Sequence, residues 1–443
     1  MTSRPLDPDE SAKLLDALSG DGGHRIVRDL LAVRRARARG VGPRPPAAAR
    51  DGAAPDYGSA FRGLSCRLQD HAAELARQRQ RLPALRERLR GLSPDDRRIL
   101  LRADPAFHNW VLGEELIEES RRSLGSDLEQ GRELADCAAI VTGALEPGGG
   151  FSAALINDLK ARAWGARGEV LRRLADLRGA GEAFAAAEGF LAQGTGDALE
   201  EAGLLELRSS LCRDQSRTPE ACCLLDDAAA VYRRYRDFHL LGRVYVRKGC
   251  VYGQAGEMSA AVDWLRKGLS LIDAERDRPL DVAARCCLLL YLTESGRTRE
   301  ARFLLKASRA EMLRHGTPWL LARLRWLEGK IYDALGFPAE AERALIDARQ
   351  GFLDLKAELN AAAVSLDLAV LYTAHGRAAE VRRLAEEILP IFRARDLHRE
   401  AIAALLALRQ ASRMETRSAR LLAEIRGHLD RARRDSPLGF ELL

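Results

Sequence analysis

Cysteine is the residue type in this 443-residue chain with the clearest capacity for metal binding or nucleophilic chemistry. Its eight cysteines include the adjacent pairs Cys222–Cys223 and Cys286–Cys287, but no C-x-x-C spacing. Adjacent side chains on a helix point about 100° apart, so neither pair has the geometry of a usual metal site or disulfide. Most of the cysteines stand among Ala and Leu, which predicts small buried apolar side chains in a reducing, cytoplasmic compartment.

The histidines and carboxylates show no catalytic spacing either. The eight histidines are scattered singly and no H-E-x-x-H motif occurs, so a catalytic zinc site has no support. Glu114–Glu115 and Glu118–Glu119 are paired carboxylates, but on an ordinary polar helix face. Motifs such as G-x-x-x-x-G-K-[ST] and G-x-S-x-G are absent. An enzyme is therefore the least favoured function, and we expect no catalytic residue, cofactor or metal.

Arginine supplies most of the positive charge. The chain has 70 basic and 64 acidic residues, a net charge of +6, and only 7 lysines, so it carries no strong whole-chain signal for nucleic acid. The local exception is the segment Arg25–Arg50, where eight arginines face one acid, Asp29. This segment has the charge to contact nucleic acid or an acidic partner. It lacks interleaved aromatic residues and contains Pro and Ala, so we expect a flexible linker.

The composition predicts an all-α protein. Ala, Leu, Arg and Glu dominate, 47% of the residues are hydrophobic, and only 5% are aromatic. These are helix formers, and strand-forming residues are few. No apolar run approaches the roughly 20 residues of a membrane span, and the N-terminus has no apolar stretch typical of a secretion signal. We therefore expect no membrane partner.

The N-terminal third is predicted to contain three regions. Residues 1–37 form a short helical module, residues 38–58 are a linker rich in Gly and Pro, and residues 59–150 form a helical domain. Within this domain a polar helix should cover residues 61–90, and Pro83 should kink or break it. The sequence Ser93-Pro-Asp-Asp96 predicts a helix start, with Ser as N-cap, Pro in the first turn and acids at the positive helix end.

A repeat dominates residues 151–400. A small or apolar anchor residue opens the second helix of each unit at intervals of 41, 40, 40, 40 and 40 residues. The six anchors are Ala180, Ala221, Ala261, Ala301, Ala341 and Val381. For the first unit, Ala183 is an alternative anchor. In the last four units a glycine stands five residues before the anchor and should close a tight turn between two helices. One such pair cannot bury both of its apolar faces, so neighbouring pairs must stack.

This pattern resembles the tetratricopeptide repeat (TPR). The third unit carries the family's aromatic, glycine and small residues at Tyr245, Gly249, Tyr252, Gly256, Ala261 and Leu265. The fifth unit carries Gly329, Tyr332, Gly336, Ala341, Leu345 and Ala348. The resemblance implies a right-handed α-solenoid of stacked helix–turn–helix repeats. Its period of 40 residues exceeds the usual 34 or so, so the extra residues must lengthen helices or connecting loops.

Regions on both sides of the array extend the interpretation. Residues 128–138 fit the second helix of a divergent unit, whose first helix would include residues 110–120. Residues 401–443 look like C-terminal capping helices. Residues 14–31 are similar to the small zinc-binding module of anti-sigma factors, which implies a degenerate copy here. Asp29, Arg34 and Arg37 stand where that module has its His and Cys ligands, so we expect no bound zinc.

The resemblance also predicts where a partner would bind, because such arrays line their concave face with first helices. The central residues expected in this groove are Arg243, Arg247, Arg323, Trp326 and Lys330, although core packing is the default for a tryptophan among Leu and Ala. Further residues projected near the same face are Arg162, Glu169, Arg172, Arg213, Cys250, Cys286, Leu290, Val370 and Thr373. A basic groove with apolar patches suits an acidic peptide or a C-terminal carboxylate.

We therefore expect a non-catalytic scaffold that binds a protein or peptide segment. Long-period repeats of this type resemble those of bacterial regulators, which implies a role in regulation or complex assembly. The alternative is a nucleic-acid-binding transcriptional regulator that uses the basic N-terminus, with the repeats as its sensor.

Overall fold

The computed structural model describes residues 57–124, 127–148, 150–394, 425 and 427. The predicted N-terminal module, the basic segment Arg25–Arg50 and nearly all of the predicted capping region lie outside these residues. The described chain is helical, with 16 α-helices and no strand beyond an isolated bridge between Gly148 and Phe151. This confirms the predicted fold class.

The described residues divide into two compact units. The first contains the described residues up to Val170 together with Ala183–Glu200, and the second contains Leu171–Glu182 and the described residues from Glu201 onward. The division passes through the first predicted repeat, so its two helices belong in part to each unit. The helices from the N-terminus to this point are α3 Tyr57–Leu89, α4 Pro94–Ala103, the 3-10 helix η1 Pro105–Phe107, α5 Trp110–Ser123, α6 Leu128–Gly143, α7 Ala153–Arg173 and α8 Leu177–Leu191.

The long helix α3 runs unbroken through Pro83, so the predicted break is wrong. The loss of one backbone N–H is tolerated because Leu75, Leu82, Leu85 and Leu89 on the same helix are buried in the core of the first unit. At the start of α4 the predicted cap is confirmed. The Ser93 hydroxyl accepts a hydrogen bond from the Asp96 backbone N–H, as an N-cap should.

The predicted divergent pair upstream of the array is present as α5 and α6, which pack against each other. Ser120 on α5 donates a hydrogen bond to the Gly131 carbonyl on α6 at 2.9 Å. A Cβ added at Gly131 would lie 3.5 Å from the Ser120 carbonyl oxygen, an ordinary contact distance. The pair therefore places small residues where its helices meet, as the later repeats do.

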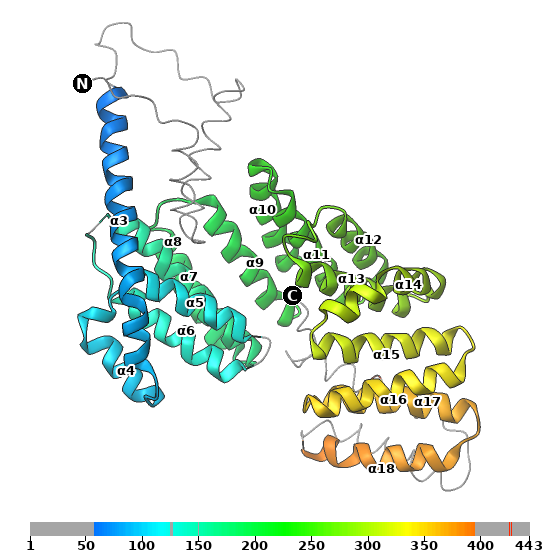
Figure 1. Ribbon diagram of the computed structural model, residues 1–443. Helices are drawn as coiled ribbons and strands as arrows, with labels where there is room; N and C mark the ends of the chain where they lie inside the picture. Colours follow the sequence, from blue (N-terminus) through cyan, green and yellow to red (C-terminus); the bar gives the residue numbers. More distant parts are fainter. Residues whose placement is uncertain (1–56, 125–126, 149, 395–424, 426, 428–443) are drawn as a thin grey trace, which may run out of the picture. The chain divides into compact units, whose positions relative to one another are not determined.

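The second unit contains five helix pairs in succession, and Figure 1 shows those from α11 to α18 running from green to orange. Consecutive helices from α10 to α18 contact each other. The helices of this unit are α9 Ala198–Asp214, α10 Thr218–Tyr235, α11 Phe238–Gln254, α12 Met258–Leu269, α13 Arg278–Glu294, α14 Thr298–His315, α15 Pro318–Ala334, α16 Pro338–Asp354, α17 Glu358–Ala374 and α18 Ala378–Ala394.

The anchor residues are buried where the helices of a pair cross, which confirms the predicted register. The five alanine anchors are fully buried, and Val381 is 3% exposed. On α11 a Cβ at Gly249 would lie 2.7 Å from Leu265 of α12. On α15 a Cβ at Gly329 would lie 2.6 Å from Leu345 of α16. Any larger residue at either glycine would force the two helices of its pair apart.

A left-handed residue closes the turn within each of the six pairs. Gly296 and Gly336 have φ values of 71° and 77°, and Gly256 and Gly376 share this conformation. The first two units place Ala175 and Ser216 at the same position, with φ values of 68° and 59°. Both residues stand five before their anchors, so the first unit is anchored on Ala180 and the alternative Ala183 is not needed.

The extra residues of the long period lie mainly in the helices. Eight of the nine helices from α10 to α18 have 17 or 18 residues. The exception, α12, has 12 residues and is followed by the long connection from Ser270 to Asp277. Ile425, one of the two described residues near the C-terminus, is buried in the apolar cluster that α15–α18 share.

Candidate binding surface

The first helices of the pairs in the second unit also contact one another. α11 contacts α13, α13 contacts α15, and α15 contacts α17. Together with α9, we call these helices the first-helix face. All five predicted groove residues lie on it, Arg243 and Arg247 on α11 and the other three on α15. Apart from Arg323, their polar partners belong to neighbouring first helices, about one repeat away in the sequence.

Two of the predicted arginines hold a buried glutamate. Glu206 on α9 is 2% exposed, and its Oε2 and Oε1 accept hydrogen bonds from Arg243 Nε at 2.9 Å and Nη2 at 2.7 Å. Arg247 Nε lies 3.1 Å from the same carboxylate, and its Nη1 donates to the Ser210 hydroxyl. Tyr232 on α10 donates to Glu206 at 2.7 Å. These contacts join three helices through one carboxylate.

The charges of this cluster explain its protonation state. Burial disfavours the ionised form of Glu206, but Arg243 and Arg247 outweigh this effect, and the pKa of the carboxyl is lowered. Burial, followed by the negative charge of Glu206, raises the pKa of Tyr232. The cluster is therefore an ionised carboxylate with two guanidinium groups and a neutral phenol. Sequence reasoning named the arginines and missed Glu206 and Tyr232.

Arg323 differs from the other two arginines. It is 2% exposed, and its guanidinium lies 5.1 Å from the ring centroid of the half-buried Trp319, one turn earlier on α15. Its buried Nε has no hydrogen-bond partner, and no carboxylate among the described residues forms an ion pair with it. Within the described part of the chain, the buried hydroxyl of Tyr291 on α13 also has no hydrogen-bond partner. A buried guanidinium without a counter-ion is costly, so a carboxylate from outside would be favoured there.

Trp326 and Lys330 lie together on α15. The Trp326 indole N–H donates to Asp367 Oδ2 on α17 at 2.6 Å, and the residue is 6% exposed. The Lys330 ammonium lies 5.8 Å from the Trp326 ring centroid and 4.0 Å from a carboxylate oxygen of Glu294 on α13. Trp326 thus packs in the core, which was the default expectation for it, and still joins α15 to α17.

The remaining residues projected onto this face fall into three groups. Arg172 and Arg213 both form ion pairs with Asp214. In the first unit Arg162 forms an ion pair with Glu114. Glu169, Cys250, Cys286 and Leu290 are buried, Thr373 is half-buried, and Val370 on α17 is 37% exposed. Val370 is therefore an apolar side chain of the first-helix face that solvent reaches.

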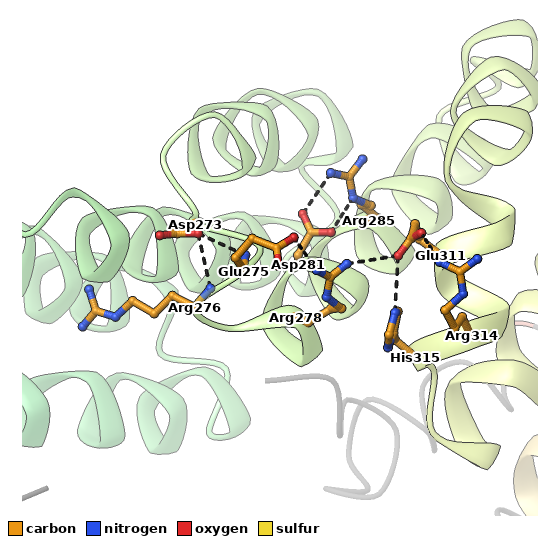
Figure 2. A network of polar contacts seen from close by, with 9 residues as sticks. All are labelled: Asp273, Glu275, Arg276, Arg278, Asp281, Arg285, Glu311, Arg314 and His315. Atoms are coloured by element: carbon orange, nitrogen blue, oxygen red, sulfur yellow. Dashed lines mark hydrogen bonds and ion pairs between the residues drawn. The ribbon is translucent and has the colours of Figure 1, made fainter.

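A separate polar cluster fixes the long connection between α12 and α13 (Figure 2). Asp273 Oδ1 accepts hydrogen bonds from two backbone N–H groups of the connection. Arg278 bridges Glu275 in the connection and Glu311 on α14, where its Nη1 donates at 3.1 Å. Arg314 donates to the same Glu311 at 2.8 Å. Glu275, Arg278, Glu311 and Arg314 each meet an opposite charge, and Asp273 is held by backbone N–H groups, so the cluster accounts for the order of this connection.

Two cysteines from successive first helices meet in the core. The Sγ atoms of Cys250 on α11 and Cys287 on α13 lie 3.7 Å apart, and both residues are buried. Sequence reasoning missed this contact because it considered only cysteines that are close in the chain. The two are 37 residues apart, nearly one repeat, and that separation would have been the signal.

Neither a metal centre nor a membrane span appears in the described part of the chain. No group of three or more His, Cys, Asp or Glu side chains has the arrangement needed to hold a metal ion among these residues. Of the helices described, none has the length and apolar character required to cross a bilayer. Asp29, Arg34 and Arg37, the degenerate ligand positions, lie outside these residues.

Comparison with solved structures identifies the fold. A Rap protein solved in complex with Competence and Sporulation Factor aligns with a TM-score of 0.50 and 12% identity, over 74% of this chain and 96% of that one. The apo form of the quorum sensor NprR from B. thuringiensis aligns with a TM-score of 0.50 and 16% identity, over 68% of this chain and 81% of that one. The fold is that of TPR-type repeats. No protein-family model and no curated protein matches the sequence.

The residues that match the TPR pattern in the sequence lie at the helix crossings and turns of the repeats. Gly249 and Ala261 lie where α11 and α12 cross, and the turn residue Gly256 has a positive φ of 88°. Gly329 and Ala341 repeat the arrangement in α15 and α16. The fold thus stacks TPR-type pairs and leaves the first helices to contact one another.

Proposed function

We propose that the chain is a binding scaffold whose first-helix face holds an acidic segment of a partner protein, and that its role is regulatory or in complex assembly. The observation that carries this proposal is Arg323, a buried guanidinium beside the half-buried Trp319 ring that forms no ion pair with any carboxylate of the described residues. Arginine pairs with carboxylates through two parallel hydrogen bonds, which gives both affinity and direction.

The other predicted groove residues have supporting roles in this proposal. Arg243 and Arg247 already hold Glu206, and Lys330 lies near Glu294, so these three charges are partly neutralised within the chain. The neutral indole of Trp326 donates a hydrogen bond to Asp367. These contacts fix the positions of the first helices against one another. Arg323 is then the residue that gains most from a carboxylate of the partner.

Two proteins of the same fold support a binding role. The Rap protein was solved as a complex with Competence and Sporulation Factor, and NprR is a quorum sensor. In the Rap structure the shared architecture is seen in a complex with a second molecule. Transferred to this chain, that role agrees with an array in which the buried Arg323 forms no ion pair with a carboxylate of the described residues.

The test selects peptides with free C-termini from a display library against the full chain. Binding of the selected peptides is then compared between the wild type, Arg323→Met and Arg343→Met. Arg343 is an exposed arginine on the second helix α16 and serves as the matched control. Loss of a desolvated charge-assisted contact of about 1.5–3 kcal/mol predicts roughly tenfold or weaker binding for Arg323→Met, with Arg343→Met unchanged.

Folding of the variant is checked in the same experiment. Methionine keeps an unbranched, mainly apolar stem in place of the inner part of the arginine side chain and removes a buried charge that has no carboxylate partner among the described residues, so the melting temperature should not fall. Selected peptides without enrichment in acids, or equal binding by Arg323→Met and the wild type, would argue against this role for the first-helix face.

A further inference from the structure

Cys250 and Cys287 form a thiol pair that the binding role does not use. They come from successive first helices, each is 3% exposed, and their Sγ atoms are 3.7 Å apart. A disulfide has an S–S distance of about 2.05 Å, so the two sulfurs need to approach by about 1.6 Å. Because α11 and α13 already contact each other, rotation of the two side chains and a small shift of the helices supply this approach.

The charges near the pair favour a thiolate at Cys250. The contact with the Cys287 thiol stabilises this thiolate most, burial opposes it, and the guanidinium groups of Arg213, Arg247 and Arg323 favour it again, so the pKa of Cys250 is lowered. The contact with Cys250 raises the pKa of Cys287. One sulfur is therefore prepared as nucleophile and its neighbour as the thiol that resolves the product.

Other buried cysteines lack this environment. Burial raises the pKa of Cys286 to about 11, although it is adjacent to Cys287 in the chain. Burial also raises the pKa of Cys137 to about 11 in the first unit. These two residues behave as inert core thiols and provide internal references for the reactive pair.

We propose that Cys250 and Cys287 are an oxidation site, at which hydrogen peroxide converts the two thiols into a disulfide between α11 and α13. The Cys250 thiolate attacks one peroxide oxygen, the O–O bond breaks, and the leaving hydroxide takes a proton to become water. The sulfur of Cys287 then attacks the sulfenic acid at Cys250, the S–S bond forms as the S–O bond breaks, and a second water leaves with the thiol proton. Two thiols lose two electrons, and one peroxide becomes two waters.

The disulfide would tie neighbouring repeats covalently at the point where their first helices meet. It would close a loop of about one repeat, so the unfolded chain loses freedom and the oxidised protein should melt at a higher temperature. It would also remove the Cys250 thiolate, which the positive charge of Arg323 stabilises. This proposal rests on the geometry of the pair and does not depend on the identity of a binding partner.

The test treats the reduced full chain with a small excess of hydrogen peroxide, denatures it, alkylates the remaining thiols and maps the peptides by mass spectrometry. The expected result is one cross-linked peptide that joins Cys250 to Cys287, with Cys286 and Cys137 alkylated. Dithiothreitol should restore both thiols. Cys250→Ser and Cys287→Ser should each abolish the cross-link, and the matched control Cys286→Ser should retain it.

Other outcomes would overturn the proposal. They are full alkylation of Cys250 and Cys287 after peroxide, or a cross-link that uses the exposed Cys223 or a second copy of the chain in their place. The wild-type peptide map decides the question without a variant, so a serine substitution that fails to fold would not hide the answer.

Discussion

The carboxylate of Glu206 is predicted to be the most costly single charge to remove from the first-helix face. Glu206→Gln keeps the size of the side chain and its contact with the Tyr232 hydroxyl, but leaves Arg243 and Arg247 without their counter-ion. Removal of one partner from a buried ion pair costs about 3–5 kcal/mol. The two arginine side chains are 30% and 17% exposed, so water offsets part of this cost. We expect a loss of about 2–3 kcal/mol.

Differential scanning calorimetry measures this loss directly. For a unit of about 200 residues each 1 kcal/mol lowers the melting temperature by about 2–4 °C, so the transition of the second unit should fall by about 4–12 °C. The matched control is Glu300→Gln, because Glu300 forms two ion pairs with Arg266 and Arg297 but is 44% exposed. The melting temperature of Glu300→Gln should equal that of the wild type. Equal shifts in the two variants would refute the idea that burial makes the Glu206 network important.

Three further predictions concern stability. Ala261→Arg should overpack the crossing of α11 and α12 and bury a charge without a partner, so the free energy of unfolding should fall by on the order of 3 kcal/mol or more. Urea denaturation measures this change, and an unchanged midpoint would mean that the register is wrong. Gly296→Ala should lower the free energy of unfolding by about 1 kcal/mol because φ is 71° there, whereas Ser216→Gly at the equivalent turn should not lower it. Similar losses of stability in the two variants would contradict this role of the left-handed backbone. The folded state holds the proton of Glu206 less tightly than the unfolded chain, so the stability from this group is full above about pH 4.3 and declines as pH falls below it. Glu206→Gln should flatten that part of the stability profile relative to wild type.

The sequence predicted the repeats well because their signal is local and recurs. The 40-residue spacing of the anchors located each second helix, and the glycine before each of the last four anchors located its turn. The first two turns have Ala175 and Ser216 in place of glycine, and the structure shows the same left-handed backbone there. Their register could be inferred from the period alone, without the usual residue type.

The candidate site was predicted in part. The register correctly placed Arg243 and Arg323 on first helices, but it did not reveal which of them has a counter-ion. That difference depends on Glu206, which lies 37 residues before Arg243 and looks like an ordinary polar helix residue in the sequence. A search for opposite charges separated by nearly one repeat would have found this pair.

Because the sequence does not reveal which arginine has a counter-ion, it also misleads the design of binding variants. The sequence alone predicts that reversal of Arg243 to Glu leaves the melting temperature unchanged. In the structure it would place a second carboxylate against the buried Glu206, and the repulsion would destabilise the unit. Arg323 has no such partner, so it is the residue at which binding can be tested apart from folding.

Site-specific photo-crosslinking tests the central claim most directly. A photoreactive amino acid replaces Val370, which is 37% exposed on the first helix α17, or, as the control, Ile346, which is 48% exposed on the second helix α16. A selected acidic peptide is then irradiated with each variant of the full chain. The account predicts a cross-link from position 370, weakened by Arg323→Met, and none from position 346. A cross-link from position 346 alone would place the bound segment on the second helices and contradict the account.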